Sequence, residues 1–553
     1  MSQKNIFFQY LKDSNQKNKR FQIYYLLILY ALIFTVCSLL IWGGCKSVQE
    51  YVKSPETSSG QISIFLKGPD ETSVDVTFDL TAINILAEDG RSKEIMSTPL
   101  KINSLDLTGQ QILLCETTLP TERYKKIQLI VKEALIKREE WTANLALPTE
   151  GIFIDIDFVL SRNQNISIFL NWDVDASVVD KYLFKPIFSV KGQVPELSSL
   201  LIYVSNEDSN NVSVINRQIG DVVATVMVGK KPRGIAASPG KARPRVYVAN
   251  SGSNTISVID PTINKVEQEI PIRFGTVPES VAVAQISLGK EMIFVANYGS
   301  ETVSVVDGST YQEILQIKCI EDRCIGNGPI ALAVDPPVED LLSSRFLSFE
   351  DINTLRQYRK RFFNVYVVNK NSNDISIIKM NRTGDRIEDI INVNVEWSPI
   401  ALSVDSQRAK VYVTNYNHED LSVIDILQVA QGNVAGAVSS VINVGFSYIG
   451  VIPDPDIDRI YLLNDVTNEI VVIRPFSEVF RAIPQVATTV SPVVGIIPVG
   501  VSPRSFMFDP EGRNIYVVNR GSNTISEIDK TRKKVIHTIN VGENPYGIAI
   551  FPF

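Results

Sequence analysis

Histidine and cysteine are scarce in this chain, whose 553 residues include 2 His and 5 Cys. Two imidazoles cannot build a multi-histidine metal centre, and the lack of a Cys-x-x-Cys-His sequence excludes covalently attached haem. An excess of positive charge is also lacking, since 54 basic residues stand against 61 acidic ones and the net charge is −7. Because phosphate binding needs a basic surface, nucleic acid is not expected as a partner.

The sequence motifs of common catalytic sites are missing as well. The chain has no Gly-x-Ser-x-Gly sequence and no phosphate-binding loop, and neither His418 nor His537 has a nucleophile at motif spacing. We therefore predict no catalytic residue, no metal site and no cofactor. The content of apolar residues, 44%, is ordinary for a folded protein, and the length exceeds the roughly 250–300 residues of a single core. At least two domains are expected.

The N-terminal region has the pattern of a membrane-targeting segment. Five basic residues and one acidic residue occupy positions 1–22, and residues 23–42 follow without a charge. A helix of 20 residues rises ~30 Å, which is enough to cross the hydrocarbon core of a bilayer. The basic flank is expected to stay in the cytoplasm and the remainder to be exported.

The uncharged run ends in Gly43-Gly44-Cys45 and resembles a bacterial lipoprotein signal, with Trp42 where such signals usually carry Leu. Residues 1–45 are therefore either a signal peptide, cleaved before an acylated Cys45, or an uncleaved single-pass anchor. Both predict a protein tethered to a membrane outside the cytoplasm, in the periplasm or on the cell surface. Residues 46–60, rich in Ser, Pro and Gly near Ser54-Pro55, are predicted to be a linker.

Residues 61–192 contain short runs in which apolar and polar residues alternate, a pattern typical of half-buried strands. The clearest runs are Ile62–Leu66, Val74–Phe78, Ile127–Val131, Ile152–Ile156 and Ile166–Leu170. We predict a β-sandwich. Through Tyr124–Leu129, Trp172–Ser177 and Phe184–Pro186, the segment resembles a family of uncharacterised domains in bacterial surface lipoproteins.

The remainder of the chain is a sevenfold repeat. The repeated phrase has five residues: an apolar residue, an aromatic residue, two further residues and Asn. It recurs with its Asn at Asn206, Asn250, Asn297, Asn369, Asn415, Asn464 and Asn519. Successive Asn residues lie 44, 47, 72, 46, 49 and 55 positions apart, and each is followed by a polar turn and further alternating strands. A period of ~40–50 residues with several strands per repeat is typical of β-propellers.

The phrase Tyr412-Val413-Thr414-Asn415 resembles the YVTN repeat of bacterial and archaeal surface β-propellers. The resemblance covers residues 198–553 and implies a seven-bladed propeller in an all-β protein. The first repeat lacks an inner strand, whereas the chain ends on an unused one at 546–550. We predict that this last strand completes the first blade, together with residues 200–228, because a closed ring has no exposed sheet edge.

Two features interrupt the repeats. Cys319 and Cys324 flank four residues in a loop, and they are predicted to form a disulfide, with two free thiols as the alternative. The long spacing holds an insertion at 336–363, where a capping-box sequence at Ser348 opens a helix expected to extend to Phe363. Its basic side could dock an acidic partner or be a solvated flank, and its residues are Arg356, Arg359, Lys360 and Arg361.

The loops that lead into the inner strands converge on one face of a propeller. The residues expected there that could bind a small anion or a peptide carboxylate are Arg233, Glu279, Arg504 and Tyr546. The alternative is a rim of solvated charges over a water-filled channel. We expect a binding or scaffold protein that recognises a protein, a glycan or an envelope component. A propeller enzyme of the lactonase, lyase or quinone-dependent type, or an accessory subunit of an envelope redox complex, is the alternative.

Overall fold

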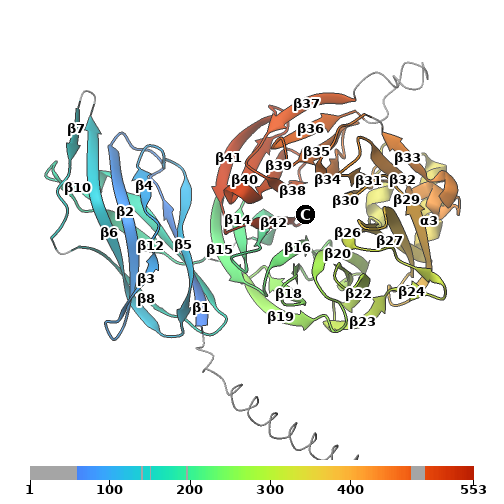
Figure 1. The fold of residues 1–553 in the computed structure, drawn as a ribbon, viewed down its shortest axis with the longest axis horizontal. Helices are drawn as coiled ribbons and strands as arrows, with labels where there is room; N and C mark the ends of the chain where they lie inside the picture. Colours follow the sequence, from blue (N-terminus) through green and yellow to red (C-terminus); the bar gives the residue numbers. More distant parts are fainter. Residues whose placement is uncertain are drawn as a thin grey trace, which may run out of the picture. The chain divides into compact units, whose positions relative to one another are not determined.

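The computed structural model describes residues 59–552, except 139–140, 150, 195–196, 442 and 475–491. The expected membrane segment, Cys45 and nearly all of the 46–60 linker lie outside these residues. Within the described part, none of the helices has the length and apolar character needed to cross a bilayer. Strands dominate this part of the chain, which is all-β and consists of many small sheets (Figure 1).

Two larger sheets within residues 59–191 share one hydrophobic core, and a further pair of short strands, β10 and β11, forms a two-stranded sheet. The four-stranded sheet has the order β12-β9-β1-β5, and the second sheet has the order β3-β2-β6-β7, with β4 paired to β2 and β8 paired to β6. The strands are β1 (Ser59–Lys67), β2 (Asp75–Ala87), β3 (Ser92–Met96), β4 (Leu100–Asn103), β5 (Gln111–Pro120), β6 (Arg123–Arg138), β7 (Trp141–Asn144), β8 (Ile152–Val159), β9 (Asn165–Asp173), β10 (Val178–Val179), β11 (Leu183–Phe184) and β12 (Ile187–Lys191). The five alternating runs of the sequence lie in or overlap β1, β2, β6, β8 and β9. Phe78, Trp172 and Phe184 pack against one another in the core.

The repeats form seven four-stranded antiparallel sheets in a propeller-like arrangement, and each inner strand contacts the inner strands of the two adjacent sheets in cyclic order (Figure 1). From the inner strand outward, sheet 1 is β42 (Pro545–Ile550), β13 (Leu201–Asn206), β14 (Asn211–Asn216) and β15 (Asp221–Met227); sheet 2 is β16 (Pro232–Ala237), β17 (Val246–Asn250), β18 (Thr255–Asp260) and β19 (Lys265–Pro271); sheet 3 is β20 (Pro278–Ser287), β21 (Lys290–Asn297), β22 (Thr302–Asp307) and β23 (Gln312–Ile317); sheet 4 is β26 (Pro329–Val334), β27 (Phe362–Asn369), β28 (Asp374–Asn381) and β29 (Ile387–Asn394). Sheet 5 is β30 (Pro399–Asp405), β31 (Lys410–Asn415), β32 (Leu421–Asp425) and β33 (Val438–Val441); sheet 6 is β34 (Tyr448–Pro453), β35 (Ile460–Asn464), β36 (Glu469–Ile473) and β37 (Val493–Pro498); sheet 7 is β38 (Pro503–Phe508), β39 (Asn514–Asn519), β40 (Thr524–Asp529) and β41 (Lys534–Asn540).

Sheet 1 joins the two ends of the repeat region. Its inner strand β42 pairs antiparallel with β13, so that Ile550 lies opposite Ile202 and Ile548 opposite Val204. The prediction that the last strand completes the first sheet is therefore confirmed. Pairing of β13 on both sides also leaves Tyr203 fully buried.

The Asn of the repeated phrase is buried and ties a hairpin together. In sheet 2, the Asn250 Nδ2 atom donates to Thr255 Oγ1 at 3.0 Å and to Ser257 Oγ at 2.8 Å, across the turn between β17 and β18. The same two bonds, to the fifth and seventh following residues, are made by Asn206, Asn297, Asn369 and Asn519. Because a buried amide without partners is costly, these bonds explain why the phrase ends in Asn.

The turn after this Asn also fixes the next inner strand. Asn254 adopts a left-handed backbone, and its Oδ1 atom accepts from the Val277 N–H at 2.9 Å, one residue before β20 begins. Equivalent bonds begin β16, β30, β38 and β42. The loop glycine packs directly on the amide as well, since a Cβ added at Gly229 would lie 2.6 Å from Asn250 Nδ2.

The insertion in sheet 4 contains two helices, α2 (Val338–Leu342) and α3 (Phe349–Arg359). The capping box at Ser348 is present, because its side chain accepts from the Asp351 N–H and the Asp351 carboxylate accepts from the Ser348 N–H. The expectation that the helix extends to Phe363 is wrong. The helix ends at Arg359, because Phe362 opens β27 and pairs with Asn381 of β28.

Short elements outside the sheets complete the described fold. The helix α4 (Ile426–Ala430), which the sequence did not predict, packs with α3 against sheets 4 and 5. The remaining elements are the hairpin of β24 (Cys319–Ile320) and β25 (Arg323–Cys324), and the 3-10 turns η1 (Asp175–Ser177), η2 (Ser198–Leu200), η3 (Val434–Gly436) and η4 (Arg520–Ser522).

Deleting residues 544–553 should remove β42 and expose the edge of β13. We expect the shortened chain to lose the cooperative thermal transition of the ring, because the first and last sheets lose their shared strand. Circular dichroism measured against temperature tests this, with deletion of residues 552–553 alone as the control. A deleted chain that melts like the full chain would contradict the role assigned to β42.

The Gly229→Ala substitution should destabilise the ring by about 1–3 kcal/mol, because the added methyl overlaps the buried Asn250 amide. Gly192→Ala is the matched control, since a Cβ there meets nothing within 4 Å and should change stability by less than about 0.5 kcal/mol. Urea unfolding of both variants provides the measurement. Equal midpoints for the two variants would show that the loop glycine is not needed for packing.

Candidate ligand site at the mouth of the ring

Each inner strand begins with a bulge at the end of the strand that forms the mouth of the ring. In β16, Pro232 pairs with Asn250 and Ile235 with Val248, so that Arg233 and Gly234 together oppose one residue. The pairing of β20 and β38 shifts at the same place, which makes Glu279 and Arg504 the extra residues there. A bulge bends its strand and re-aims the extra side chain. The repeat therefore places one bulge residue per sheet at this end of the ring.

The four predicted mouth residues lie together and form a chain of contacts. The Arg233 guanidinium donates to Glu279 Oε1, and the Tyr546 hydroxyl donates to Glu279 Oε2 at 3.2 Å. On its other side, the Tyr546 oxygen accepts from Arg504 Nη2. The Arg504 guanidinium also lies over the Tyr546 ring, 4.3 Å from the centroid.

Two residues that the sequence analysis missed extend this group. Glu207 Oε1 accepts from Arg233 Nη2 at 2.8 Å, and its Oε2 lies 2.6 Å from Arg520 Nη2. Both missed residues directly follow the Asn of the repeated phrase, Glu207 after Asn206 and Arg520 after Asn519. Comparing the residue that follows the repeated Asn across the seven repeats would have identified both of them in the sequence. Together with the four predicted residues, they form a group of six that we call the mouth cluster: Glu207, Arg233, Glu279, Arg504, Arg520 and Tyr546.

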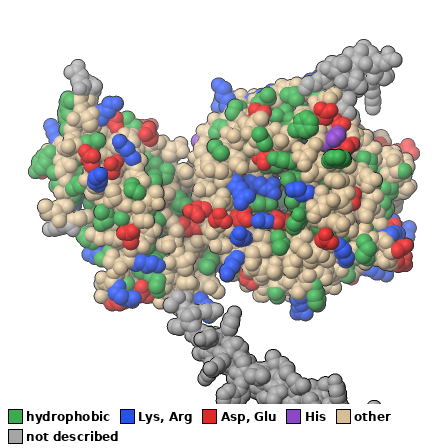
Figure 2. All heavy atoms as spheres, viewed as in Figure 1, with side chains coloured by type: hydrophobic (Ala, Val, Ile, Leu, Met, Phe, Trp, Pro, Cys, Tyr) green, Lys and Arg blue, Asp and Glu red, His purple; other side chains and the backbone are tan. Residues whose placement is uncertain are grey.

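The mouth cluster carries an excess of positive charge, because three guanidinium groups meet two carboxylates. The carboxylates are shielded, since the Glu207 side chain is 3% exposed and that of Glu279 is 6% exposed. Arg504 is half-buried and contacts Tyr546 but no carboxylate among the described residues. Figure 2 shows basic and acidic side chains gathered next to one another near the centre of the ring.

The opposite side of the mouth is apolar. Sheets 4, 5 and 6 place Ile330, Ile400 and Ile449 at the positions that carry charged or aromatic residues in the other sheets. Further along the inner strands lies a cavity of about 550 Å³, which we call the axial cavity. Of the residues that line it, Asp509 alone is charged. The mouth therefore offers charged groups to a ligand, and the axial cavity offers an apolar surface.

The remaining predicted site residues have varied surroundings. Cys319 and Cys324 form the predicted disulfide. The Arg359 side chain is 13% exposed and pairs with Asp335 at 3.0 Å, so it contacts sheet 4. Arg356, Lys360 and Arg361 are exposed, and docking of an acidic partner there stays a prediction. No three His, Cys, Asp or Glu side chains in the described ranges lie close enough together to hold a metal ion.

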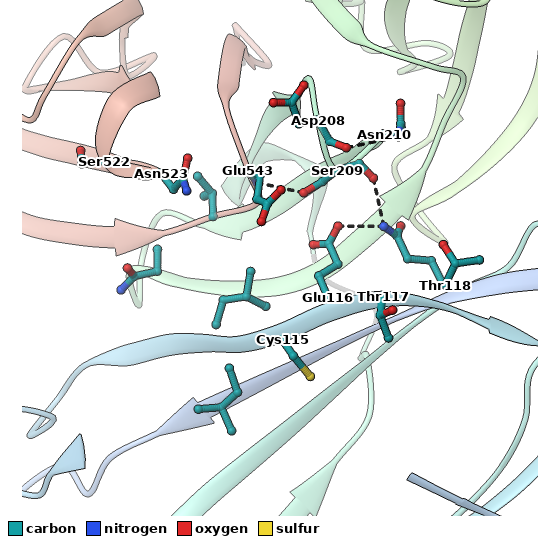
Figure 3. A pocket seen from close by; sticks show the side chains of 15 residues that line it. Cys115, Glu116, Thr117, Thr118, Asp208, Ser209, Asn210, Ser522, Asn523 and Glu543 are labelled. Carbon is teal, nitrogen blue, oxygen red and sulfur yellow. Dashed lines mark hydrogen bonds between the residues drawn. The ribbon is translucent and has the colours of Figure 1, made fainter. Parts of the chain in front are cut away.

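A second cavity, of about 580 Å³, lies where the sandwich meets sheets 1 and 7, and we call it the junction cavity (Figure 3). The Glu116 carboxylate of β5 accepts from Gln61 Nε2 at 2.8 Å and from Asn211 Nδ2, both through Oε1. Its Oε2 atom is buried without a hydrogen-bond partner among the described residues. Burial raises the pKa of the Glu116 carboxyl to about 7, and the nearby charge of Glu543 acts in the same direction.

Further polar contacts hold the junction. The Thr225 hydroxyl of β15 lies 3.1 Å from Ser63 Oγ and 2.9 Å from Ser167 Oγ. The Gln111 side chain accepts from the Val222 N–H at 3.0 Å and donates to the Val222 carbonyl at 3.3 Å. Because all these groups are buried or partly buried and paired, the sandwich has a specific position on sheet 1.

Comparisons with known proteins match part of the chain to one family. A family model described as a domain of unknown function (DUF4382) matches residues 59–186, in line with the resemblance found in that segment. No curated protein matches the chain.

Several solved structures are similar in fold. Hydrazine synthase from Kuenenia stuttgartiensis is 16% identical with a TM-score of 0.46, over 60% of this chain and 93% of that one. A putative 6-phosphogluconolactonase from Bacteroides fragilis is 14% identical with a TM-score of 0.43, over 64% of this chain and 99% of that one. The dihydro-heme d1 dehydrogenase NirN is 12% identical with a TM-score of 0.42, over 65% and 76%. These are β-propeller-type proteins, and the likeness concerns the fold alone.

The raised pKa of Glu116 predicts a pH-dependent stability. The unfolded carboxyl has a pKa near 4.5 and the folded one near 7, so the folded state loses stability as the pH rises from about 4.5 to 7 and the loss is complete above pH 7. Glu116→Gln mimics the protonated form and should be more stable than the wild type at pH 8, by up to ~3 kcal/mol. The two proteins should converge toward pH 4.5.

Calorimetric melting of the full chain at pH 5 and pH 8 provides the measurement. Glu94→Gln is the matched control, because Glu94 is exposed on β3 and its replacement should leave the pH dependence unchanged. A wild type and a Glu116→Gln variant that show the same difference at both pH values would refute the assignment.

Proposed function

We propose that the chain is a binding protein whose ring, a seven-bladed propeller of the YVTN type, holds an anionic group at its mouth. The observation that carries this proposal is the imbalance of the mouth cluster, in which three guanidinium groups meet two carboxylates and Arg504 has no carboxylate partner among the described residues. A half-buried guanidinium that is not neutralised attracts a carboxylate, to which it can donate two parallel hydrogen bonds.

The scaffold around Arg504 favours binding because the site is already formed. Its bulge in β38 and its contact with the Tyr546 ring hold the guanidinium in place. On the other side, the Tyr546 hydroxyl donates to Glu279, which is itself held by Arg233. Ligand binding therefore costs little conformational entropy of the protein side chains, and preorganisation of this kind raises affinity.

The expected setting of this function is the cell envelope. The disulfide between Cys319 and Cys324 is typical of proteins outside the cytoplasm and supports export. A lipid on Cys45, or an uncleaved helix in residues 23–42, would hold the protein on a membrane. The ligand is then an anionic group on a protein, a glycan or another envelope component.

Arg504→Gln should weaken the binding of propionate, the probe for this site, by about 10-fold or more, because hydrogen bonds between charged groups contribute roughly 1.5–3 kcal/mol. Saturation-transfer NMR on the full chain in lipid nanodiscs provides the measurement. Arg345→Gln is the matched control, since the Arg345 side chain is 74% exposed and lies in the insertion rather than at the mouth. Equal propionate affinity in wild type and Arg504→Gln, or no binding by the wild type, would overturn the proposal.

A further inference from the structure

The axial cavity differs in character from the mouth that precedes it. Its wall is built by the inner strands of several sheets and includes Ile235, Val283, Leu332, Val404 and Met507. These residues belong to β16, β20, β26, β30 and β38. Water in an apolar cavity lacks polar partners, so the cavity favours an apolar occupant.

The apolar wall begins a short distance from the mouth cluster along the same strands. Ile235 follows Arg233 by two residues, and Met507 follows Arg504 by three. At ~3.3 Å per residue, these offsets correspond to roughly 7–10 Å. A group bound at Arg504 could therefore extend an apolar chain of this length into the cavity.

We propose that the ligand is an amphipathic monoanion, an unbranched alkyl carboxylate whose head binds Arg504 and whose chain fills the axial cavity. The inference rests on the proposed function, because it takes the mouth cluster as the site of the carboxylate. A single negative charge matches the single excess positive charge of the cluster. On the other side of the mouth, the partly buried Ile330 and Ile400 give an apolar surface that suits the first carbons of the chain, whereas Ile449 is buried in the core.

A ligand with a positively charged head group does not suit the mouth cluster. An alkylammonium head at the mouth would face Arg504, whose guanidinium makes a hydrogen bond and a cation–π contact with Tyr546 and pairs with no carboxylate among the described residues. The two carboxylates of the cluster are engaged, Glu207 by Arg233 and Arg520 and Glu279 by Arg233 and Tyr546. The cluster therefore distinguishes an alkyl carboxylate from an alkylammonium of the same length.

The test compares propionate, pentanoate and heptanoate by saturation-transfer NMR on the full chain in lipid nanodiscs, with empty nanodiscs correcting for partition into lipid. Burial of each added methylene should raise affinity by about fourfold. Heptylammonium should not bind. Propionate that binds through Arg504 with no gain along the series would overturn this inference and leave the proposed function standing. No binding by any carboxylate would overturn both.

A pair of variants at Met507 tests where the chain lies. Met507 is partly buried and lines the axial cavity, and Met507→Gln keeps its length while adding a polar amide. This variant should lower heptanoate affinity by about 10-fold and leave propionate binding unchanged, whereas Met507→Leu should preserve both. Equal loss of heptanoate and propionate in Met507→Gln, or no loss of either, would overturn the assignment of the chain to this cavity.

Discussion

The buried asparagine at the end of each repeated phrase is the constraint on which the ring depends. In six of the seven sheets its amide donates across the hairpin, as from Asn250 to Thr255 and Ser257, whereas the Asn464 amide of sheet 6 donates to the Phe446 carbonyl. In five sheets a loop glycine packs on the same amide. Four residues further on, a left-handed Asn such as Asn254 accepts from the N–H just before the next inner strand in five of the seven sheets. These sheets thus set the start of their neighbours, so an error at one amide would displace the inner strand that carries the next mouth residue.

This regularity leaves the mouth residues free to vary. The bulge after the first residue of the inner strand recurs from sheet to sheet, while the side chain it presents is Arg in sheet 2, Glu in sheet 3 and Ile in sheets 4–6. The backbone geometry of the site therefore recurs with the repeat, whereas its chemistry depends on which residue occupies the bulge position in each sheet. The charged residues come from neighbouring sheets and the isoleucines from the remaining ones, so the mouth has two different sides.

The sequence predicted the repeated architecture well, because the same phrase occurs seven times and each copy supports the others. It also predicted Arg233, Glu279, Arg504 and Tyr546, since their position in the repeat defines their place in space. Glu207 and Arg520 were missed because they reach the mouth from turns rather than inner strands. The buried Glu116 was not predictable, since its environment arises where the sandwich packs on the ring. The end of α3 was misplaced because helical periodicity continued into residues that the sheet recruits as β27.

The turn between β13 and β14 connects the mouth of the ring to the junction cavity. At its start, Glu207 pairs with Arg233 and Arg520 at the mouth. Two residues later, the Ser209 carbonyl accepts from Gln61 of the sandwich at 3.0 Å, and Asn211 donates to Glu116. A turn this short cannot shift at one end while the other stays in place, because its backbone is also bonded to the segment before β42. The position of the Glu207 carboxylate, and with it the charge balance around Arg504, therefore depends on the packing of the sandwich as well as on the ring itself.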